Sequence, residues 1–474
     1  MFIGRKTELK QLNEQYNSSR FEFAVIYGRR RIGKTSLIQE FIKDKKALFF
    51  TGLETTQKQN LINLSQVILQ SSLDDITFNS FQAALENVFE KAKKERIIFV
   101  IDEYPYLANT YPAISSILQL LIDKNKEDSK LFLILCGSSL SFMEEQVLGY
   151  QSPLYGRRTS QYKIKPFSFF ETCDYFNSFS YEEKAFIYGL TSGIPLYISL
   201  FRENKSLKQN IIDIFLSSNG YLFEEPTNLI KQECRDPSTY NSIIQAIATG
   251  ATKLSEISNQ VGIETGLCTT YIKKLISLGI IIKDYPIYKP SKKQTIYLLE
   301  DHMFQFWYKF ILPNISLINI GMGEKVYEKI EPHFYEFMGY IFEDICKQYL
   351  WLLNIREELP LFFLKLGRWW GNDPRIKAEA EIDILAYAEI DILAYNDENQ
   401  ILLGECKWRN EEIDKKVLEK AIFRSELFSF PNKFIYLFSK TGFTSYCLEY
   451  AKTNPSIHLV TFQDIIKAYE SNQS

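Results

Sequence analysis

The sequence predicts an α/β protein whose first domain, residues 1–165, is built on a mostly parallel sheet. Short apolar runs alternate there with polar helical segments, which is the pattern of parallel strands joined by covering helices. Several runs end in glycine, acidic or serine residues, which a parallel sheet presents at its carboxyl edge. The pattern then becomes helical and aromatic-rich over 166–235, three short helices and a hairpin over 236–310, and a second α/β segment over 325–474.

The apolar run at residues 21–27 leads into GRRRIGKTS, in which glycine, four variable residues, glycine, lysine and threonine follow one another. The glycines allow such a loop to turn its backbone N–H groups toward a phosphate. The lysine supplies charge for the β- and γ-phosphates, the threonine a hydroxyl for Mg²⁺, and the next helix its positive end. The sequence therefore predicts a phosphate-binding loop (P-loop) for ATP or GTP. Its nucleotide-binding residues are Gly28, Arg29, Arg30, Arg31, Ile32, Gly33, Lys34, Thr35 and Ser36.

A second run, residues 96–103, reads RIIFVIDE and predicts a strand buried on both faces of the sheet. This strand would deliver Asp102 and Glu103 to the carboxyl edge, beside the phosphate-binding loop. We expect Asp102 to hold Mg²⁺ together with Thr35, directly or through water, and Glu103 to orient the attacking water. An apolar run followed by two acids is common, but its place downstream of a complete loop makes it specific.

A third run, residues 131–136, ends in Gly-Ser-Ser, where Ser138 is a candidate sensor of the γ-phosphate. A serine-capped turn between strand and helix is the alternative. Further along, LYGRR holds Arg157 and Arg158. One of the two, Arg157 by preference, is a candidate arginine finger that acts in cis or from a neighbouring subunit. The three arginines inside the loop are expected to be solvated or ion-paired.

Composition is that of an ordinary globular protein, with 46% hydrophobic and 24% charged residues in 474. No apolar run approaches the ~18 residues of a membrane span, and the start of the sequence lacks a signal-peptide pattern. We therefore expect a cytoplasmic protein with no membrane partner. The cysteines are scattered, without a CxxC pair, so neither a zinc site nor a disulfide framework is expected. A net charge of −3 opposes bulk electrostatic binding of nucleic acid but allows a local basic patch.

Residues 240–248, 252–259 and 266–278 show helical periodicity and precede GIIIKDYPIYKPSKKQTIYLL, which reads as a β-hairpin. This order resembles the winged helix-turn-helix family. The resemblance implies that the third helix exposes one face, made by Thr269, Thr270, Lys273 and Lys274. It implies that the other face is buried and is made by Leu267, Tyr271, Leu275 and Leu278. Residues 241–300 contain seven Lys or Arg against four acids, so contact with DNA and contact with protein alone remain equal alternatives.

The octapeptide AEIDILAY occurs twice in succession within residues 380–395, and NDENQ and ILLGECKW follow. A hairpin whose turn is 396–400 would set Asp391 directly opposite Glu405, and strand alternation puts Lys407 on the same face as Glu405. Asp391 and Glu405 are therefore candidate ligands of Mg²⁺, and Lys407 a candidate group to orient or deprotonate water. This is the equipment of phosphodiester hydrolysis. A surface hairpin with an ion pair is the alternative.

The repeat complicates this assignment. One strand through both copies would have sixteen residues, more than the usual about 3 to 10, so we expect one copy to loop or bulge out. The hairpin geometry would set Asp383 opposite residue 413, beyond the strand. The acid of the site is therefore assigned to Asp391 rather than Asp383.

An acid followed by Glu-x-Lys on the next strand resembles the PD-(D/E)xK nuclease superfamily. That resemblance implies a restriction-endonuclease-like α/β domain, in which Glu343 of GYIFED would be the matching helical acid. The whole chain resembles the archaeal-type ATPase family, a STAND-like branch of the P-loop ATPases. The motifs that carry this resemblance are FIGRKTELKQL, GRRRIGKTS, VIDE, CGSS, SPLYGRR, GIP, the winged helix and the segment from RWWG to GECKW.

The family resemblance implies an ATP-binding and ATP-hydrolysing protein with a AAA-like domain, a helical lid, a winged helix and a nuclease-like domain. It implies a DNA-related or defence role, with residues 2–5 bordering the adenine pocket. Our leading hypothesis is thus an ATP-regulated, Mg²⁺-dependent nuclease acting on DNA. The alternative is an ATP-gated switch that binds DNA or protein and whose last domain is inert. A motor is disfavoured because no second ATPase domain or pore-loop signature is present; a homo-oligomer remains open.

Overall fold

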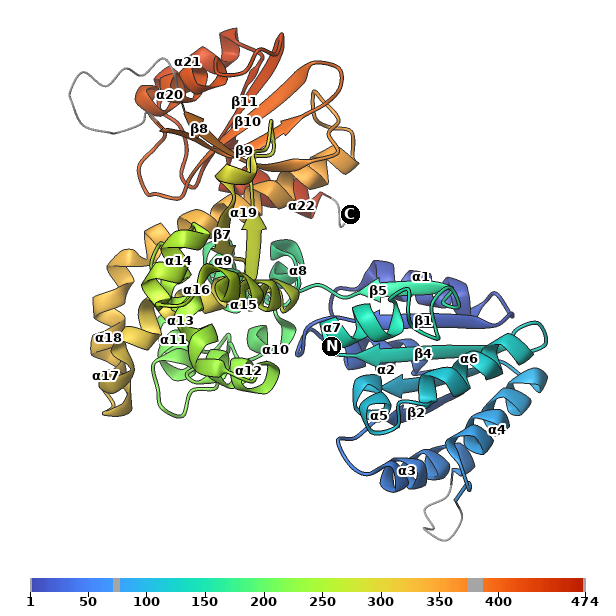
Figure 1. Cartoon of the computed structure of the whole chain (residues 1–474). Helices are drawn as coiled ribbons and strands as arrows, with labels where there is room; N and C mark the ends of the chain where they lie inside the picture. Colours follow the sequence, from blue (N-terminus) through green and yellow to red (C-terminus); the bar gives the residue numbers. More distant parts are fainter. Residues whose placement is uncertain (1, 71–76, 373–386, 472–474) are drawn as a thin grey trace. The chain divides into compact units, whose positions relative to one another are not determined.

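The computed structural model describes residues 2–70, 77–372 and 387–471. The chain divides into two compact units (Figure 1). The first comprises Met1–Phe167 and the short segment Ile194–Leu196, and the second comprises Ser168–Gly193 and Tyr197–Ser474.

The first unit is built on a five-stranded sheet. Its strands are β1 (Glu22–Tyr27), β2 (Ala47–Thr51), β3 (Ile97–Asp102), β4 (Leu131–Gly137) and β5 (Ser160–Lys163). Their order is β2-β3-β4-β1-β5, and every neighbouring pair is parallel. The strands β1, β3 and β4 are buried at every residue, as two-sided coverage by helices requires. The predicted parallel sheet and the predicted buried strand before Glu103 are confirmed.

Helices cover both faces of this sheet. They are α1 (Lys6–Tyr16), α2 (Lys34–Ile42), α3 (Gln57–Leu69), α4 (Phe81–Lys94), α5 (Tyr104–Thr110), α6 (Ile114–Asn125) and α7 (Leu140–Phe142), which a π-helical turn (Met143–Val147) extends. Apolar residues of α1 and α2 pack on one face, and those of α3 to α6 pack on the other. The carboxyl edge of the sheet is thereby left to the loops that follow β1, β3 and β4.

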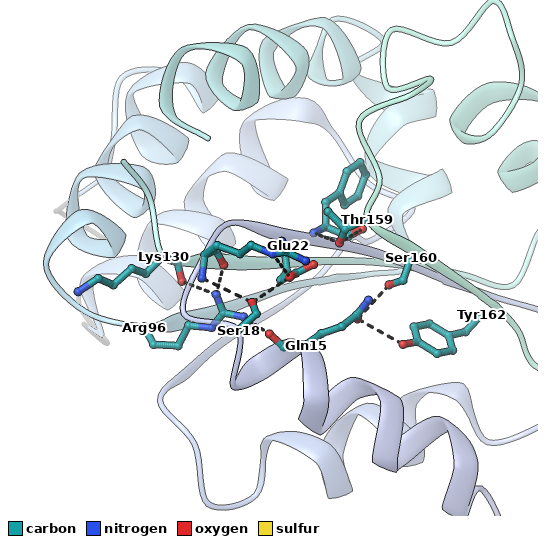
Figure 2. Close-up of polar contacts among 10 residues, drawn as sticks. Gln15, Ser18, Glu22, Arg96, Lys130, Thr159, Ser160 and Tyr162 are labelled. Carbon is teal, nitrogen blue, oxygen red and sulfur yellow. Dashed lines mark hydrogen bonds and ion pairs between the residues drawn. The ribbon is translucent and has the colours of Figure 1, made fainter. Parts of the chain in front are cut away.

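A polar network joins the opposite edge of the sheet to α1 (Figure 2). The Arg96 guanidinium donates hydrogen bonds to the backbone carbonyl oxygens of Gln15 and Lys130 over 2.8 and 3.1 Å. The buried Glu22 carboxylate, at the start of β1, accepts a hydrogen bond of 2.8 Å from Ser18 Oγ. These bonds fix the end of α1 against the beginnings of β1 and β4, so they set the frame from which the phosphate-binding loop projects.

The second unit begins with the segment predicted to be helical. It holds α8 (Phe169–Cys173), α9 (Tyr181–Thr191), α10 (Pro195–Ile198, whose first two residues belong to the first unit), α11 (Leu207–Phe215) and α12 (Glu225–Glu233). The serines before α8, α9 and α11 accept hydrogen bonds from backbone N–H groups of the first turn, which is why these helices begin where they do.

Three helices and a two-stranded antiparallel sheet come next, in the predicted order. They are α13 (Pro237–Ala248), α14 (Leu254–Val261), α15 (Thr265–Ser277), β6 (Ile281–Asp284) and β7 (Ile296–Leu299). The inward orientation expected of Leu267 is wrong, because this side chain is 48% exposed. The buried stripe of α15 instead runs through Cys268, Ile272 and Leu275, at spacings of four and three residues. Thr270 and Lys273 are exposed as expected.

Aromatic-rich helices connect this module to the last domain. They are α16 (His302–Phe306), α17 (Ile315–Asn319), α18 (Gly323–Ile330) and the long α19 (Phe334–Ile355), joined by short π-helical and 3₁₀ turns. None of the helices in the described ranges has the length and apolarity needed to cross a bilayer.

The last domain contains a second five-stranded sheet. Its strands are β8 (Leu366–Asn372), β9 (Tyr387–Tyr395), β10 (Gln400–Lys407), β11 (Asn432–Ser439) and β12 (Ile457–Thr461), and its helices are α20 (Lys415–Ser425), α21 (Ser445–Thr453) and α22 (Phe462–Glu470). The strands follow one another across the sheet, with β8, β9 and β10 antiparallel and β10, β11 and β12 parallel. In Figure 1, α20 and α21 cover one face of this sheet and α19 lies on the other. The ring of Phe342 in α19 packs against Trp408, which directly follows β10.

Candidate nucleotide and carboxylate sites

The phosphate-binding loop lies between β1 and α2. Gly28 has a φ of +153°, and a Cβ added to it would stand 2.4 Å from the carbonyl oxygen of Ile164. Gly33, directly before α2, has a φ of +84°. L side chains rarely adopt either conformation, so both glycines of the motif are required by the shape of the loop.

Lys34 is the first residue of α2 and is buried. Its Nζ donates hydrogen bonds of 3.0 Å to the carbonyl oxygens of Gly28 and Arg29, so the ammonium lies inside the curve of the loop. Burial lowers the pKa of Lys34, and the nearby carboxylates Asp102 and Glu103 only partly oppose this shift. Burial therefore disfavours the charged form of the Lys34 ammonium, and a strongly anionic ligand would compensate for this cost.

The two groups predicted to share Mg²⁺ lie in contact at the ends of α2 and β3. Thr35 Oγ1 donates a hydrogen bond of 3.0 Å to Asp102 Oδ2, and Asp102 Oδ1 accepts one of 3.0 Å from the N–H of Glu103. Hydroxyl and carboxylate oxygens are the ligands that Mg²⁺ prefers. The residues present therefore fit the ion, with Thr35 and Asp102 as the groups that would hold it.

The structure also brings Glu103 and Ser138 together. Ser138 Oγ lies 2.9 Å from each carboxylate oxygen of Glu103, and the Ser138 N–H lies 3.4 Å from one of them. Glu103 has a φ of +48°, a conformation that costs a non-glycine residue about 1 kcal/mol or more. Ser138 is thus a direct hydrogen-bond partner of Glu103. The position of Ser138 at the end of β4 allows this contact but does not require it.

Residues outside the motif, and one arginine inside it, support the loop through contacts that the sequence did not predict. Arg30 Nη2 donates a hydrogen bond of 2.8 Å to the hydroxyl of Tyr106 in α5. Pro195, in the Gly-Ile-Pro break, lies 4.0 Å from the position that a Cβ on Gly33 would take. Arg5 is buried, donates to the carbonyl oxygen of Ile32 over 3.2 Å and so braces the loop from the side. The break and the first residues were noticed in the sequence, but their contact with the loop depends on tertiary folding.

Arg157 makes a bidentate pair with Asp123 of α6. Its Nε and Nη2 lie 2.9 and 2.6 Å from the two carboxylate oxygens, and its Nη1 donates to the carbonyl oxygen of Pro153 over 2.9 Å. The side chain is one quarter exposed. The guanidinium thus has a partner inside its own unit, and a role as arginine finger stays a prediction.

The hairpin of β9 and β10 has the predicted register. Tyr395 pairs with Ile401 and Ile392 with Gly404, so the next step sets Asp391 opposite Glu405. The strand β9 contains the second AEIDILAY copy only, preceded by Tyr387. The rest of the first copy, with Asp383, lies outside the described residues.

Glu405 lies between two cations. Its Oε1 is 2.7 Å from Lys407 Nζ, and its Oε2 is 3.0 Å from Arg424 Nη1 of α20. Burial would lower the pKa of Lys407, but the carboxylates of Glu405 and Asp391 outweigh it and the pKa is raised. The ammonium therefore stays charged. No spacing in the sequence marks Arg424, which reaches Glu405 only because α20 packs on β10.

A β-bulge interrupts β9 at Asp391. Residues 367 and 369 of β8 pair with residues 393 and 390 of β9, respectively. Two residues of β9, Asp391 and Ile392, therefore stand opposite one residue of β8, Arg368. Asp391 Oδ2 accepts a hydrogen bond of 2.8 Å from the N–H of Cys406. Bulges of this kind change the direction of a side chain and are frequent beside active sites. Regular alternation, on which the sequence prediction relied, does not hold at this residue.

A second group of charges surrounds Arg368. Its guanidinium lies 3.8 Å from the Glu343 carboxylate of α19 and forms an ion pair with Glu389 of β9. Burial, with the charge of Asp391, raises the pKa of Glu343 to about 7. Burial, with the charge of Glu405, raises the pKa of Asp391 to about 6. Glu343 therefore lies near Asp391, where the superfamily resemblance places its helical acid.

The donors of this carboxylate site fit Mg²⁺ in kind, since Asp391 and Glu405 offer oxygen atoms. The number of side chains that offer these oxygen atoms is smaller than expected for a dedicated metal site. Across residues 2–70, 77–372 and 387–471, no three Asp, Glu, His or Cys side chains gather closely enough to hold a metal ion together. Asp391 and Glu405 are the pair that would hold one, with Lys407 beside them.

Two family models match separate parts of the chain. Residues 2–201 match a family of ATPase domains found predominantly in Archaea. Residues 307–419 match a family of archaeal and bacterial proteins of unknown function. The chain is 34% identical over 432 residues to an uncharacterised protein of Methanocaldococcus jannaschii, covering 90% of this chain and 91% of that protein.

Two further similarities cover less of the chain. An uncharacterised ATP-binding protein of Methanocaldococcus jannaschii is 46% identical over 46 residues, which are 10% of this chain and 78% of that protein. Among solved structures, the Walker-type ATPase PABY2304 of Pyrococcus abyssi matches with a TM-score of 0.50 and 19% identity. The match covers 65% of this chain and 96% of that one, and it shows a shared fold.

Proposed function

This chain belongs to the family of archaeal and bacterial proteins that join an ATPase domain to a domain of unknown function, and we propose that it is an ATP-regulated, Mg²⁺-dependent nuclease acting on DNA. The ATPase part follows from the family and from the fold. The observation that carries the nuclease part is the hairpin of β9 and β10, which sets Asp391 opposite Glu405 with Lys407 2.7 Å from the latter.

In the ATPase half, the loop from Gly28 to Lys34 binds the phosphates through its N–H groups and the buried ammonium. Glu103 accepts a hydrogen bond from the water that attacks the γ-phosphate and so orients it. Ser138 holds Glu103 in place and releases it when the γ-phosphate offers the hydroxyl another acceptor. Mg²⁺, held by Thr35 and Asp102, supplies charge neutralisation on the phosphate oxygens.

In the nuclease half, Asp391 and Glu405 would hold Mg²⁺, which would supply positive charge to a scissile phosphate when bound. Lys407 holds its proton, because the two carboxylates raise its pKa, and so it acts by orienting a water and by stabilising negative charge on the phosphate. The module of α13 to α15 with β6 and β7 has the helix order of a winged helix, and it exposes Thr270 and Lys273 on α15. These side chains support contact with the DNA backbone.

One experiment tests both halves. Wild type, Lys34→Ala, Glu405→Ala and Glu398→Ala are incubated with Mg²⁺, ATP and several DNA and RNA forms, and phosphate release and strand cleavage are read together. Glu398 is the matched control, because it is an exposed acid at the tip of the same hairpin. We expect Lys34→Ala to lose ATP hydrolysis, Glu405→Ala to lose cleavage alone, and Glu398→Ala to lose neither. Cleavage that survives Glu405→Ala refutes the nuclease assignment.

The second candidate function is an ATP-gated switch whose last domain is inert. One observation favours it: Lys407 and Arg424 already neutralise Glu405 from two sides, so the carboxylate has less affinity for a further cation. A switch would bind DNA or a protein with an affinity that ATP changes, and it would leave every nucleic acid intact. Binding of labelled DNA measured with ATP and with ADP, in parallel with the cleavage assay, separates the two functions.

A further inference from the structure

The connection between β6 and β7, residues 285–295, packs against the second sheet within the second unit. We call it the hairpin loop. The strand that it meets is β8, which lies at the edge of that sheet. An edge strand leaves a row of backbone groups without strand partners, and a covering loop is one way to pair them.

Three hydrogen bonds join the hairpin loop to the edge of β8. The N–H of Ile287 donates to the carbonyl oxygen of Arg368 over 3.0 Å. Gln294 Nε2 donates to the carbonyl oxygen of Trp370 over 3.1 Å, and Trp370 Nε1 donates to the carbonyl oxygen of Gln294 over 3.2 Å. The loop thus holds β8 at Arg368 and again two residues later.

Apolar contacts reinforce these bonds. The ring of Tyr288 packs edge-on to Tyr395 of β9, with the ring centres 5.4 Å apart, and to Phe428 and Phe430 at 5.7 and 5.5 Å. A Cβ on Gly367 would stand 3.3 Å from Ile287, so the loop lies directly on the strand. Aromatic pairs of this geometry stabilise an interface beyond the area they bury.

Arg368 is the residue that stands opposite the bulge at Asp391. Its carbonyl oxygen is held by Ile287, and its guanidinium pairs with Glu343 and Glu389. The hairpin loop, the bulge and the acids around the carboxylate site therefore meet at one residue. A shift of the loop would move the backbone of Arg368 and, through the β8–β9 pairing, the backbone of Asp391.

We infer that the hairpin loop is a positioning element of the carboxylate site: by holding β8 at Arg368, it keeps the bulge that sets the direction of the Asp391 side chain. This inference rests on the proposed nuclease function for its effect on cleavage. It also adds a route of regulation. A ligand that moves the module of α13 to α15 with β6 and β7 moves the hairpin loop as well, because this loop joins β6 to β7. A misplacement of about 1 Å in a catalytic group costs about 100-fold in rate, so small shifts suffice.

The test uses the full chain with Tyr288→Ala, which removes the ring contacts, and Tyr288→Phe, which keeps them. Gln294→Ala is a milder variant that removes one hydrogen bond to Trp370 and covers the case in which Tyr288→Ala does not fold. Lys293→Ala is the matched control, because it truncates an exposed side chain of the same loop.

Two readouts are taken: hydrogen exchange of peptides from β8 and β9, and Mg²⁺-dependent cleavage as a function of Mg²⁺ concentration. We expect Tyr288→Ala to speed exchange at β8 by about tenfold or more, with Gln294→Ala intermediate. The Mg²⁺ concentration for half-maximal cleavage rises as well, while Tyr288→Phe and Lys293→Ala resemble wild type. We expect the rate of ATP hydrolysis by these variants, measured at low nucleic-acid concentration, to equal that of wild type.

Unchanged exchange at β8 and β9 in both Tyr288→Ala and Gln294→Ala overturns the inference, as does an equal effect of Lys293→Ala. Faster exchange with unaltered Mg²⁺ dependence also overturns it, because the loop would then only stabilise the strand. If wild type cleaves no nucleic acid, the proposed function fails instead. In that case, binding of Mn²⁺ by wild type and Tyr288→Ala, measured by calorimetry, replaces the cleavage readout.

Discussion

The Ser138 hydroxyl donates a hydrogen bond to the Glu103 carboxylate, and Ser138 Oγ lies 2.9 Å from each of the two carboxylate oxygens. The two residues follow the ends of neighbouring parallel strands, β4 and β3. A carboxylate held in this way is oriented but also occupied. Under the proposed function, its release is the step that the arrival of a γ-phosphate controls.

We predict that Glu103→Gln lowers the rate of ATP hydrolysis by about 100-fold or more, because a positioned base contributes about 10²- to 10⁴-fold. Nucleotide affinity should stay within about threefold of wild type, since the amide keeps the hydrogen bond to Ser138 and removes no phosphate contact. Phosphate release and titration with a fluorescent ATP analogue measure the two effects. An equal loss of affinity and rate would place Glu103 in binding rather than in catalysis.

Ser138→Ala separates orientation from chemistry. The carboxylate of Glu103 remains, but its main side-chain partner is lost. We expect hydrolysis to fall by about tenfold, the effect of a lost hydrogen bond of about 1.4 kcal/mol to a charged group. The preference for ATP over ADP should shrink in the same titrations. A variant with wild-type turnover and wild-type preference would show that Ser138 only caps the end of β4.

The third prediction concerns the arginine finger. If Arg157 serves a neighbouring subunit, Arg157→Ala lowers hydrolysis by about 10³-fold, while Asp123→Ala, which removes its partner, leaves hydrolysis near wild type. If the pair is structural, both variants lower the melting temperature alike and hydrolysis falls little in either. Arg158→Ala is the third arm. The rate per subunit, measured over a range of protein concentrations, shows whether the finger acts in trans.

Much of this site could be read from the sequence because its residues are close together along the chain or follow one simple rule. The phosphate-binding loop is a local motif, and four apolar residues before Asp102 are enough to specify a buried strand. The register of the β9–β10 hairpin followed from turn length and strand alternation, which depend on few residues. The buried face of α15 was misplaced at Leu267, since a 13-residue helix has few turns to fix the phase of its stripe.

The remainder depends on contacts between segments far apart in the chain. Arg424 reaches Glu405 only when α20 packs on the sheet, and no motif records that approach. At the bulge, two residues of β9 stand opposite one residue of β8. The sequence of β9 alone does not specify this unequal pairing. The same holds for Tyr288, whose partner Tyr395 belongs to a sheet that begins almost 80 residues later.

The fourth prediction tests the register of the carboxylate site. We expect Asp391→Asn to abolish Mg²⁺-dependent cleavage and Asp383→Asn to leave it intact, because β9 places only the former opposite Glu405. Cleavage of labelled DNA by the two variants measures this directly. The reverse result would mean that the first AEIDILAY copy replaces the second in the active hairpin. Asp397→Asn, in the turn, is the control for loss of an exposed acid.

The fifth prediction concerns Glu22, in the network of Figure 2. Burial by itself would raise the pKa of Glu22, but hydrogen bonds from Thr159, Ser18 and Arg20 outweigh it, and the pKa is lowered. The unfolded chain therefore binds a proton at this residue at a higher pH than the folded chain does. The resulting stabilisation is complete above the unfolded value of about 4.3 and is lost as the pH falls through the lowered folded pKa.

Glu22→Gln should thus lower the free energy of unfolding of the first unit by about 1 to 2 kcal/mol at pH 7, as expected for lost charge-assisted hydrogen bonds. The difference from wild type should shrink below about pH 4. Urea unfolding followed by circular dichroism measures it, with Glu14→Gln on the exposed side of α1 as the matched control. All five tryptophans lie in the second unit, so their fluorescence reports an unfolding transition that Glu22→Gln should leave in place. A difference that persists unchanged to pH 3 would mean that Glu22 acts through packing rather than through its charge.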